Sequence, residues 1–233
     1  MAGWDDILRE LGDTPSQTDI VRRKYLKALS NYTGRNTIAY YSAFLTRSVA
    51  GTDINDSDMT GFMNALKGMD CSKGLDLILH TPGGSPAAAE AIVSYLRSKF
   101  HNDIRVIVPQ ISMSAGTMIA CAAKVIIMGK QSSLGPIDPQ FNGITAYNIK
   151  AEFEEAKADL AVHPENTQYW AIKLQQYPTA FMKTALDAIE LSSNLITVWL
   201  GSCMYNSSIP EEKAIVENIV QQLNEHDRSK THG

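Results

Sequence analysis

The sequence predicts an α/β fold in which a parallel sheet is wrapped by helices. Three short apolar runs carry this prediction: Leu75–His80, Ile104–Gln110 and Lys124–Gly129. Runs with so little polar alternation are typical of strands that are buried on both faces of a sheet. Helical segments stand between them, "SPAAAEAIVSYLRSKF" and "SAGTMIACAA". This βαβ alternation predicts that ligands bind at the carboxyl ends of the strands.

Helical additions are expected on both sides of this alternating region. Apolar spacing predicts a short helix from Trp4 to Leu11 and a longer one from about Ser16 to Asn31. A run of β-forming residues starts a first strand at Asn36, and a helix follows it. After a turn-rich loop the pattern predicts further helices at about Tyr147–Leu160, Asn166–Gln175, Pro178–Leu200 and Pro210–Asn224.

Composition narrows the class of protein. With 233 residues, 44% hydrophobic and 20% charged, the chain can bury one generous core, as ordinary globular proteins do. Its formal net charge of -4 argues against a phosphate-binding surface, which needs clustered Lys and Arg. We therefore expect no nucleic-acid partner.

The sequence also bears on location and metal binding. The opening "MAGWDDILRELG" has acids where a signal peptide needs a basic stretch and then an apolar one. Val106–Ala123 is uncharged, but Pro109 and Gly116 interrupt it, so we expect a strand and a buried helix and no membrane insertion. The three cysteines are far apart and odd in number, which supports neither disulfides nor a cysteine zinc site. We expect a reduced, cytoplasmic protein.

Paired glycines mark the first of two unusual strand-to-helix turns. In "LILHTPGGSPAAAEA", Gly83 and Gly84 stand between a strand and a helix. Glycines there allow backbone conformations that direct N–H groups outward at the helix N-terminus. No Lys-Ser/Thr follows and the G-x-G-x-x-G spacing is absent, so an oxyanion donor fits better than a phosphate cradle. A tight turn with no further role is the alternative.

A serine marks the second turn. In "VPQISMSAGTMIACAAK", Ser114 follows a strand and begins a helix, with the N–H of Ala115 beside it. Gly116 lets a neighbouring strand pass closely. The two turns together supply a nucleophile and backbone donors from adjacent strand ends, which is the arrangement that acyl transfer requires.

The motifs "HTPGG", "SMSAGT" and "SSLGPIDPQ" resemble the Clp-protease/crotonase fold. Specifically, the chain is similar to the serine dehydrogenase proteinase family, whose relatives are signal peptide peptidase A and the stomatin-specific membrane proteases. The resemblance covers roughly Asn36–Leu200. It implies a Clp/crotonase-like peptidase domain over 36–205, between a helical extension over 1–35 and a C-terminal helix and tail over 206–233.

The resemblance implies a serine endopeptidase that works through an acyl-enzyme on Ser114. The family's oxyanion donors correspond to the second glycine of P-G-G and to the residue after the serine, here Gly84 and Ala115. Gly83 and His80 are the substrate-binding candidates at the end of the preceding strand. For His80, a hydrogen-bonded structural histidine is the alternative.

The general base is where this sequence departs from the family pattern. Clp proteolytic subunits carry a histidine in I-H-Q-P, and "PIDPQ" puts Asp138 in that place. The stomatin-specific enzymes use a lysine about nine residues after Asn-Gly, and "NGITAYNIK" puts Lys150 eight residues after Asn142. The resemblance therefore implies Lys150 as the base, with Asp138 orienting a catalytic group or fixing the loop. His80 is a further candidate.

A lysine base must be neutral, so its pKa must fall well below its usual value near 10.4. We expect burial against Ile149 and Phe153 to lower it. The alternative is a solvent-facing Lys150 that pairs with Glu154 one helical turn later and stays charged.

The resemblance also implies partners. It suggests peptide or unfolded protein substrates and a ring or stacked homo-oligomer, built partly through the C-terminal helices. The last helix carries an apolar stripe expected to serve subunit contacts: Ile215, Val216, Ile219, Val220 and Leu223. No metal or organic cofactor is implied, and the motifs carry no information about an ATPase partner.

Two other functions remain open at this point. A crotonase-type acyl-CoA enzyme would use the same oxyanion geometry without a nucleophilic serine. A non-catalytic scaffold or binding subunit would use neither the oxyanion geometry nor a nucleophilic serine.

Overall fold

A four-stranded parallel sheet organises the first half of the chain. The computed structural model describes residues 6, 9–10, 15–46, 50–141 and 143–224. The strand order is β1-β2-β3-β5, with bounds Asn36–Tyr41, Leu75–His80, Ile104–Val108 and Val125–Met128. All three pairings are parallel, so the carboxyl ends of the strands lie at one edge of the sheet. The predicted α/β fold with a parallel sheet wrapped by helices is confirmed.

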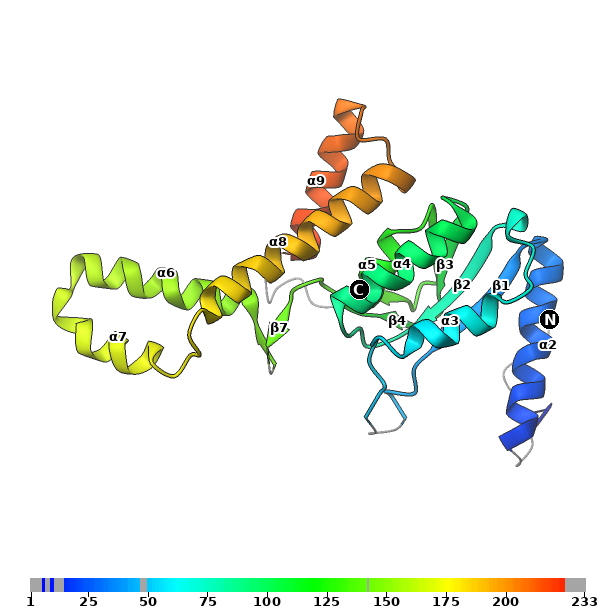
Figure 1. Ribbon diagram of the computed structural model, residues 1–233, viewed down its shortest axis with the longest axis horizontal. Coiled ribbons are helices and arrows are strands. Elements are labelled where there is room, and N and C mark those ends of the chain that lie inside the picture. The colour runs from blue at the N-terminus through cyan, green and yellow to red at the C-terminus, as the bar shows by residue number, and fades with distance from the viewer. Residues whose placement is uncertain (1–5, 7–8, 11–14, 47–49, 142, 225–233) are drawn as a thin grey trace.

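Helices cover this sheet and explain the apolar runs. Helices α3 (Asp58–Leu66), α4 (Pro86–Phe100) and α5 (Ala115–Cys121) pack against it, and α2 (Pro15–Thr33) lies along β1 (Figure 1). In β2, five of six residues are buried, which is why its sequence barely alternates. Helix α4 starts where the Ser85 hydroxyl accepts a hydrogen bond from the Ala88 N–H, at 3.2 Å.

The second half of the chain is mostly helical and extends away from the sheet. Two small β elements come first: β4 (Ile111–Ser112) pairs with β6 (Ser133–Leu134), and β7 (Gln140–Phe141) forms a hairpin with β8 (Ile144–Thr145). Helices α6 and α7 then project away from the sheet as an arm, and α8 returns to α9 (Figure 1). These four helices span Ala146–Val162, Thr167–Leu174, Phe181–Trp199 and Pro210–Asn224. Short 3-10 turns lie at Cys71–Lys73 and Pro164–Asn166, and a π-helical turn at Leu200–Met204.

Helix α9 belongs to the core of its own chain. Val216 is 1% exposed and lies in the main hydrophobic core, against which Ile219, Val220 and Leu223 also pack. Of the stripe that we expected to serve subunit contacts, Ile215 is exposed. Val216 is therefore unavailable for subunit contacts, because α8 and the π-helical turn hold α9 against the core. An interface role for the rest of the stripe stays a prediction.

Some expectations fall outside what the structure describes. The helix expected from Trp4 to Leu11 lies largely outside the described residues, and so does the tail from residue 225 onward. Within the described part of the chain, no helix has the length and apolarity needed to cross a bilayer.

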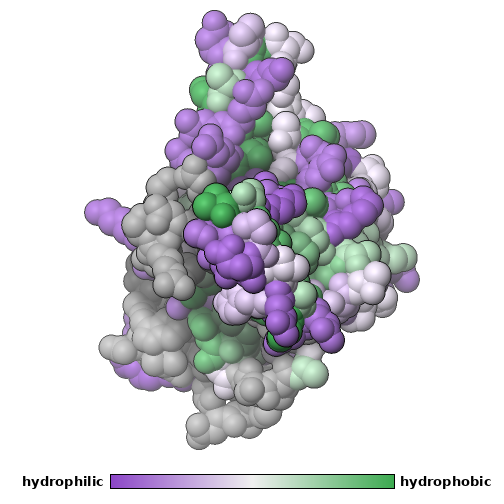
Figure 2. Space-filling model, turned by 90° about the vertical axis from the view of Figure 1, so that its left-hand side faces the viewer, coloured by the Kyte–Doolittle hydropathy of each residue, from purple (hydrophilic) through white to green (hydrophobic). Residues whose placement is uncertain are grey.

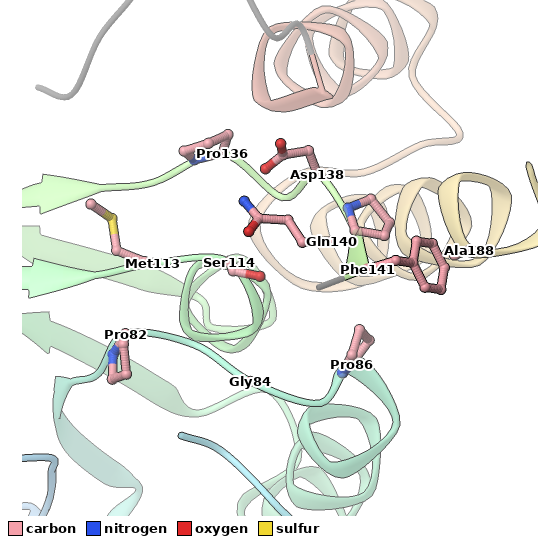
Figure 3. Close-up of a pocket in the computed structure, with 11 residues that line it drawn as sticks. Pro82, Gly84, Pro86, Met113, Ser114, Pro136, Asp138, Gln140, Phe141 and Ala188 are labelled. Atoms are coloured by element: carbon pink, nitrogen blue, oxygen red, sulfur yellow. The ribbon is translucent and has the colours of Figure 1, made fainter. Parts of the chain in front are cut away.

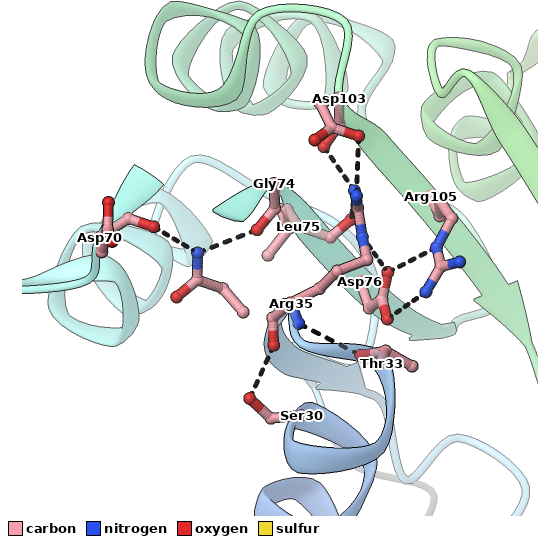
Figure 4. A network of polar contacts seen from close by, with 10 residues as sticks. Ser30, Thr33, Arg35, Asp70, Gly74, Leu75, Asp76, Asp103 and Arg105 are labelled. Carbon is pink, nitrogen blue, oxygen red and sulfur yellow. Dashed lines mark hydrogen bonds and ion pairs between the residues drawn. The ribbon is translucent and has the colours of Figure 1, made fainter. Parts of the chain in front are cut away.

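A buried ion network holds α2 to the amino end of the sheet (Figure 4). The Asp76 side chain on β2 is fully buried, and it accepts hydrogen bonds from Arg35 at 2.8 Å and from Arg105 at 2.7 and 2.8 Å. Arg35 also pairs with Asp103 at 2.8 Å. Burial alone would raise the pKa of Asp76, but the hydrogen bonds from Arg105 and Arg35 outweigh it and hold this pKa below its usual value.

Candidate active site

Ser114 stands on a strained turn between β4 and α5. Its backbone has φ 49° and ψ -118°, a conformation that residues with a Cβ rarely adopt. Such strain costs on the order of 1–3 kcal/mol and is found where the surrounding structure enforces it. Here the enforcing bonds run from the Gly116 N–H to the Met113 carbonyl at 2.8 Å and from the Met118 N–H to the Ser114 carbonyl at 3.1 Å. The turn resembles the strand-to-helix elbows that present nucleophilic serines.

Close packing explains the small residues that follow Ser114. A Cβ built on Gly116 would lie 2.4 Å from Thr81 Cγ2 and 2.5 Å from Ser112 Oγ. The next residue, Thr117, is also buried, and its hydroxyl donates to the Ser112 or the Gly135 carbonyl at 2.9 and 2.8 Å. The helix can therefore start against the end of β2 only if its first residues are small.

The Pro-Gly-Gly loop directs one backbone N–H away from its neighbouring strand. Gly84 forms a parallel bridge with Ile54, in which the Ile54 N–H donates to the Gly83 carbonyl at 2.7 Å and the Ser85 N–H donates to the Ile54 carbonyl at 2.8 Å. In such a bridge the N–H of the middle residue points to the opposite side. A Cβ on Gly84 would lie 2.3 Å from the Ile54 carbonyl oxygen, and φ is 149°, so the position requires glycine.

The two turns pack directly against each other. A Cβ built on Gly83 would lie 2.6 Å from the Met113 carbonyl oxygen, 2.8 Å from Ser114 Cβ and 3.2 Å from the Ala115 nitrogen. The Ala115 N–H starts helix α5, where the first N–H groups have no partner inside the helix. The structure thus brings together the predicted residues Gly83, Gly84, Ser114 and Ala115.

A pocket of about 470 Å³ opens in front of Ser114 (Figure 3). The residues that line it come from the P-G-G loop, the serine turn, the loop after β6, the β7 strand and α8: Pro82, Gly84, Pro86, Met113, Ser114, Pro136, Asp138, Pro139, Gln140, Phe141 and Ala188. Gln140 projects its amide into the pocket from β7 (Figure 3). Gln140 is not among the site residues predicted from the sequence, although it closes the "PIDPQ" motif.

Asp138 lies in the wall of this pocket, 2% exposed. The loop that carries it is held by α9, because the Ile137 N–H donates to the Leu223 carbonyl at 3.0 Å. The charge of the Asp138 carboxylate acts on Tyr147 of α6. Burial raises the pKa of Tyr147, a hydrogen bond with Ser193 opposes this, and the Asp138 charge raises it further.

Lys150 does not line the pocket. It lies exposed on α6, while its neighbour Ile149 is fully buried in a second small core with Ala146 and Ala185. The expected burial of Lys150 is not found. Glu154, its alternative partner, forms an ion pair with Lys157 at 2.8 Å.

His80 also lies outside the pocket lining. It is 1% exposed and stacks on Tyr41 at a centroid distance of 4.8 Å, with Phe44 at 5.2 Å. Neither ring nitrogen makes a well-formed hydrogen bond with a described residue. Burial lowers the pKa of His80, and the nearby Ile111 backbone partly opposes this. Aromatic stacking and the Ile111 backbone therefore hold the ring, which is consistent with the structural role considered for His80 from the sequence.

Across residues 15–46, 50–141 and 143–224, no three His, Cys, Asp or Glu side chains gather where they could hold an ion.

A parallel α/β fold with a serine on a strained turn beside a Pro-Gly-Gly loop is typical of the ClpP-like class of hydrolases. The chain belongs to the ClpP-like SDH-type serine proteinase family, whose family model matches residues 21–165. This confirms the resemblance to the serine dehydrogenase proteinases and supports a serine peptidase in general.

Two relatives come from Methanocaldococcus jannaschii. Uncharacterized protein MJ0137 is 36% identical over 149 residues, which is 62% of this chain and 52% of the relative. Uncharacterized protein MJ1495 is 44% identical over 75 residues, 32% of this chain and 25% of the relative. The chain thus spans about half the length of the first relative and a quarter of the second.

Proposed function

We propose that this protein is a serine endopeptidase that hydrolyses peptide bonds through an acyl-enzyme on Ser114. The observation that carries the proposal is the strained Ser114 turn, which packs directly against Gly83 and opens onto the pocket. Membership of a serine proteinase family supports the general class of reaction.

In the proposed mechanism, Ser114 Oγ attacks the carbonyl carbon of the peptide bond and gives its proton to a base. The oxyanion that forms accepts hydrogen bonds from the N–H groups of Gly84 and Ala115. A single donor of this kind is worth roughly 3–4 kcal/mol in the transition state. The C–N bond then breaks, the amine leaves with the proton, and water hydrolyses the ester to free Ser114.

For the base we propose Asp138 in place of Lys150. Asp138 is buried in the pocket wall, whereas Lys150 is exposed and outside the pocket. The two candidates predict different pH profiles. A carboxylate base works when it is ionised and a lysine base works when it is neutral, so activity through a lysine base requires a much higher pH.

The test is modification by a small alkyl fluorophosphonate, followed by intact mass and peptide mapping. We expect one adduct on Ser114 and none in Ser114→Ala. A folded protein that is not modified would instead favour the acyl-CoA enzyme or the non-catalytic scaffold. Profiles of kcat against pH for Asp138→Asn and Lys150→Ala then identify the base. Unchanged turnover in Asp138→Asn together with lost turnover in Lys150→Ala would identify Lys150 as the base instead of Asp138.

We also propose a homo-oligomer with peptide or unfolded protein substrates. The arm of α6 and α7 and the adjoining α8 expose Val162, Ile172 and Val198 by 71%, 59% and 62%. Figure 2, which views the molecule from the side of this arm, shows apolar residues scattered among hydrophilic ones. Static light scattering tests this: Val162→Asp and Ile172→Asp should lower the mass, and Glu165→Gln on the same arm should not. An unchanged mass in both Asp variants would remove the arm as an interface.

A further inference from the structure

The walls of the Ser114 pocket are apolar and poor in hydrogen-bond donors. Four of the lining residues are prolines, which have no N–H group: Pro82, Pro86, Pro136 and Pro139. Met113, Phe141 and Ala188 add further apolar surface. Among the described residues that line the pocket, Asp138 is the one ionisable group, and there is no lysine or arginine. Gln140 adds one polar amide beside Asp138, and most of the remaining surface can recognise a side chain only by burying apolar area.

Apolar ends flank the serine on both sides. In Figure 3, Ser114 lies between Met113 at one end of the pocket and Phe141 with Ala188 at the other. Asp138 lies on the wall across from the P-G-G loop, between these two ends (Figure 3). A peptide that passes over Ser114 would therefore place its side chains at the apolar ends, away from the carboxylate.

The Met113 side chain closes one end of the pocket. Its thioether packs on Gly135, and this contact fixes how deep the pocket is at that end. A Cβ built on Gly135 would lie 2.3 Å from Met113 Sδ and 3.2 Å from Met113 Cα. Gly135 does not have the left-handed φ that would require glycine, so its missing Cβ serves chiefly to make room for Met113.

The backbones on both sides of this contact are fixed. The Gly135 N–H donates to the Ser112 carbonyl at 3.1 Å, and the Gly135 carbonyl accepts the Thr117 hydroxyl at 2.8 Å. The Met113 N–H donates to the Thr81 carbonyl at 3.1 Å. If the contact is crowded, the flexible thioether is the part that moves, and the open volume beside it is the pocket.

We infer that Met113, seated on Gly135, sets the size of the apolar side chain that this pocket accepts next to the bond that is cut. This inference rests on the proposed function. Burying a leucine-sized side chain favours it over a charged one by about 10- to 100-fold in the rate of acylation. A negatively charged side chain is disfavoured further by Asp138.

The competing specificity is for basic side chains, because a buried carboxylate can pair with lysine or arginine. The position of Asp138 between the two ends argues against it, since a basic side chain that reached Asp138 would leave the apolar ends unfilled.

The experiment measures how fast Ser114 is modified by peptidyl diphenyl phosphonates that differ only in one side chain: Ala, Leu, Phe, Lys or Glu. The small alkyl fluorophosphonate, which has no such side chain, is run in parallel. We expect Leu to react at least ten times faster than Lys and Glu. If the small probe modifies Ser114 but Lys reacts as fast as Leu, the inference is overturned while the proposed function stands. If the small probe fails, both are overturned.

A double-mutant cycle tests the size limit. Gly135→Ala should push the thioether into the pocket and lower the ratio of the Phe rate to the Ala rate by about ten-fold. Met113→Ala should raise this ratio, and Gly135→Ala combined with Met113→Ala should also accept Phe, because no thioether is left to displace. Thermal unfolding of each variant checks the fold. If Gly135→Ala does not fold, Met113→Ala decides alone, and an unchanged ratio there removes Met113 as the size determinant.

Discussion

The two ends of the parallel sheet are built by opposite means. At the amino end, Asp76, Arg35 and Arg105 are joined by short hydrogen bonds in a buried network (Figure 4). At the carboxyl end, Ser114 has a strained backbone and Gly84 leaves an N–H facing away from its strand partner. Both residues line the same pocket (Figure 3). Satisfied polar groups thus stabilise one end, while the other end retains backbone strain and N–H groups that the proposed mechanism would use. Mutations at the two ends should therefore separate stability from activity.

The largest effect is expected at Ser114. Ser114→Ala should reduce turnover by up to about 10⁶-fold, because the proposed nucleophile is lost. Ser114→Gly should be equally inactive but more stable than Ser114→Ala by about 1 kcal/mol, since glycine relieves the positive φ. Urea unfolding and peptide hydrolysis measure the two quantities. Ser112→Ala is the matched control, and an active Ser114→Ala beside an inactive Ser112→Ala would mean that the wrong serine was chosen.

The elements that could be predicted from the sequence are those with local signals. The apolar runs gave β2, β3 and β5, and the predicted last helix matches α9 at both bounds. The turns at Gly83-Gly84 and Ser114 could be located because strained backbone leaves glycines and small residues in the sequence.

The polar groups could not be predicted, because their partners are distant in sequence. Arg35 and Arg105 lie 41 and 29 residues from Asp76, so an acid inside an apolar strand gave no sign of its network. Motif spacing alone indicates Lys150 as the base. On a helix, adjacent residues are turned by about 100°, so a buried Ile149 directs Lys150 toward solvent. Ala188 reaches the pocket from α8, and no local signal marks it.

The next largest effect is expected on stability, when the buried network at the amino end is broken. Asp76→Asn should lower the free energy of unfolding by about 3–5 kcal/mol at pH 7, because two arginines lose a buried anionic partner. Turnover per folded molecule should remain. The pKa of Asp76 is lowered in the folded state, so its contribution is present above the carboxyl pKa of unfolded chains, near 4, and is lost as pH falls through its lower folded value.

Chemical unfolding at pH 7 and at pH 3 measures this prediction, and the gap between Asp76→Asn and the parent protein should narrow at pH 3. The matched control is Asp103→Asn, whose carboxylate pairs with the same Arg35 but is 52% exposed. Its cost should be below about 1 kcal/mol. Equal costs for the two variants would contradict the view that burial gives Asp76 its importance.

At the carboxyl end, Gly84→Ala should lower kcat by about 10²–10³-fold. The new Cβ would meet the Ile54 backbone at 2.3 Å, so the loop must shift and its N–H must move away from the proposed oxyanion. Gly61→Ala is the control, because a Cβ there meets nothing within 4 Å. If Gly84→Ala is folded and fully active, the Pro-Gly-Gly turn is structural only.

The smallest expected effect concerns the contact between α9 and the Asp138 loop. Asn224 Nδ2 donates to Ser193 Oγ at 3.0 Å, next to the point where the Leu223 carbonyl accepts the Ile137 N–H. Asn224→Ala removes one partly buried hydrogen bond, worth about 1 kcal/mol. It also removes a buried Oδ1 that finds no partner among the described residues, which offsets part of the loss.

Asn224→Ala should therefore cost less than about 1 kcal/mol in stability, yet lower kcat several-fold with KM nearly unchanged, because a looser α9 end leaves Asp138 less well positioned. Asn218→Ala is the control on the same helix, where an exposed hydrogen bond from Gln222 at 2.7 Å is lost by a residue that does not line the pocket. It should leave kcat unchanged. If both variants lower kcat equally, the effect comes from α9 as a whole and the contact at Ile137 does not position Asp138. If only Asn224→Ala lowers kcat, and its profile of kcat against pH shifts, then the contact between α9 and Ile137 positions Asp138 in the pocket.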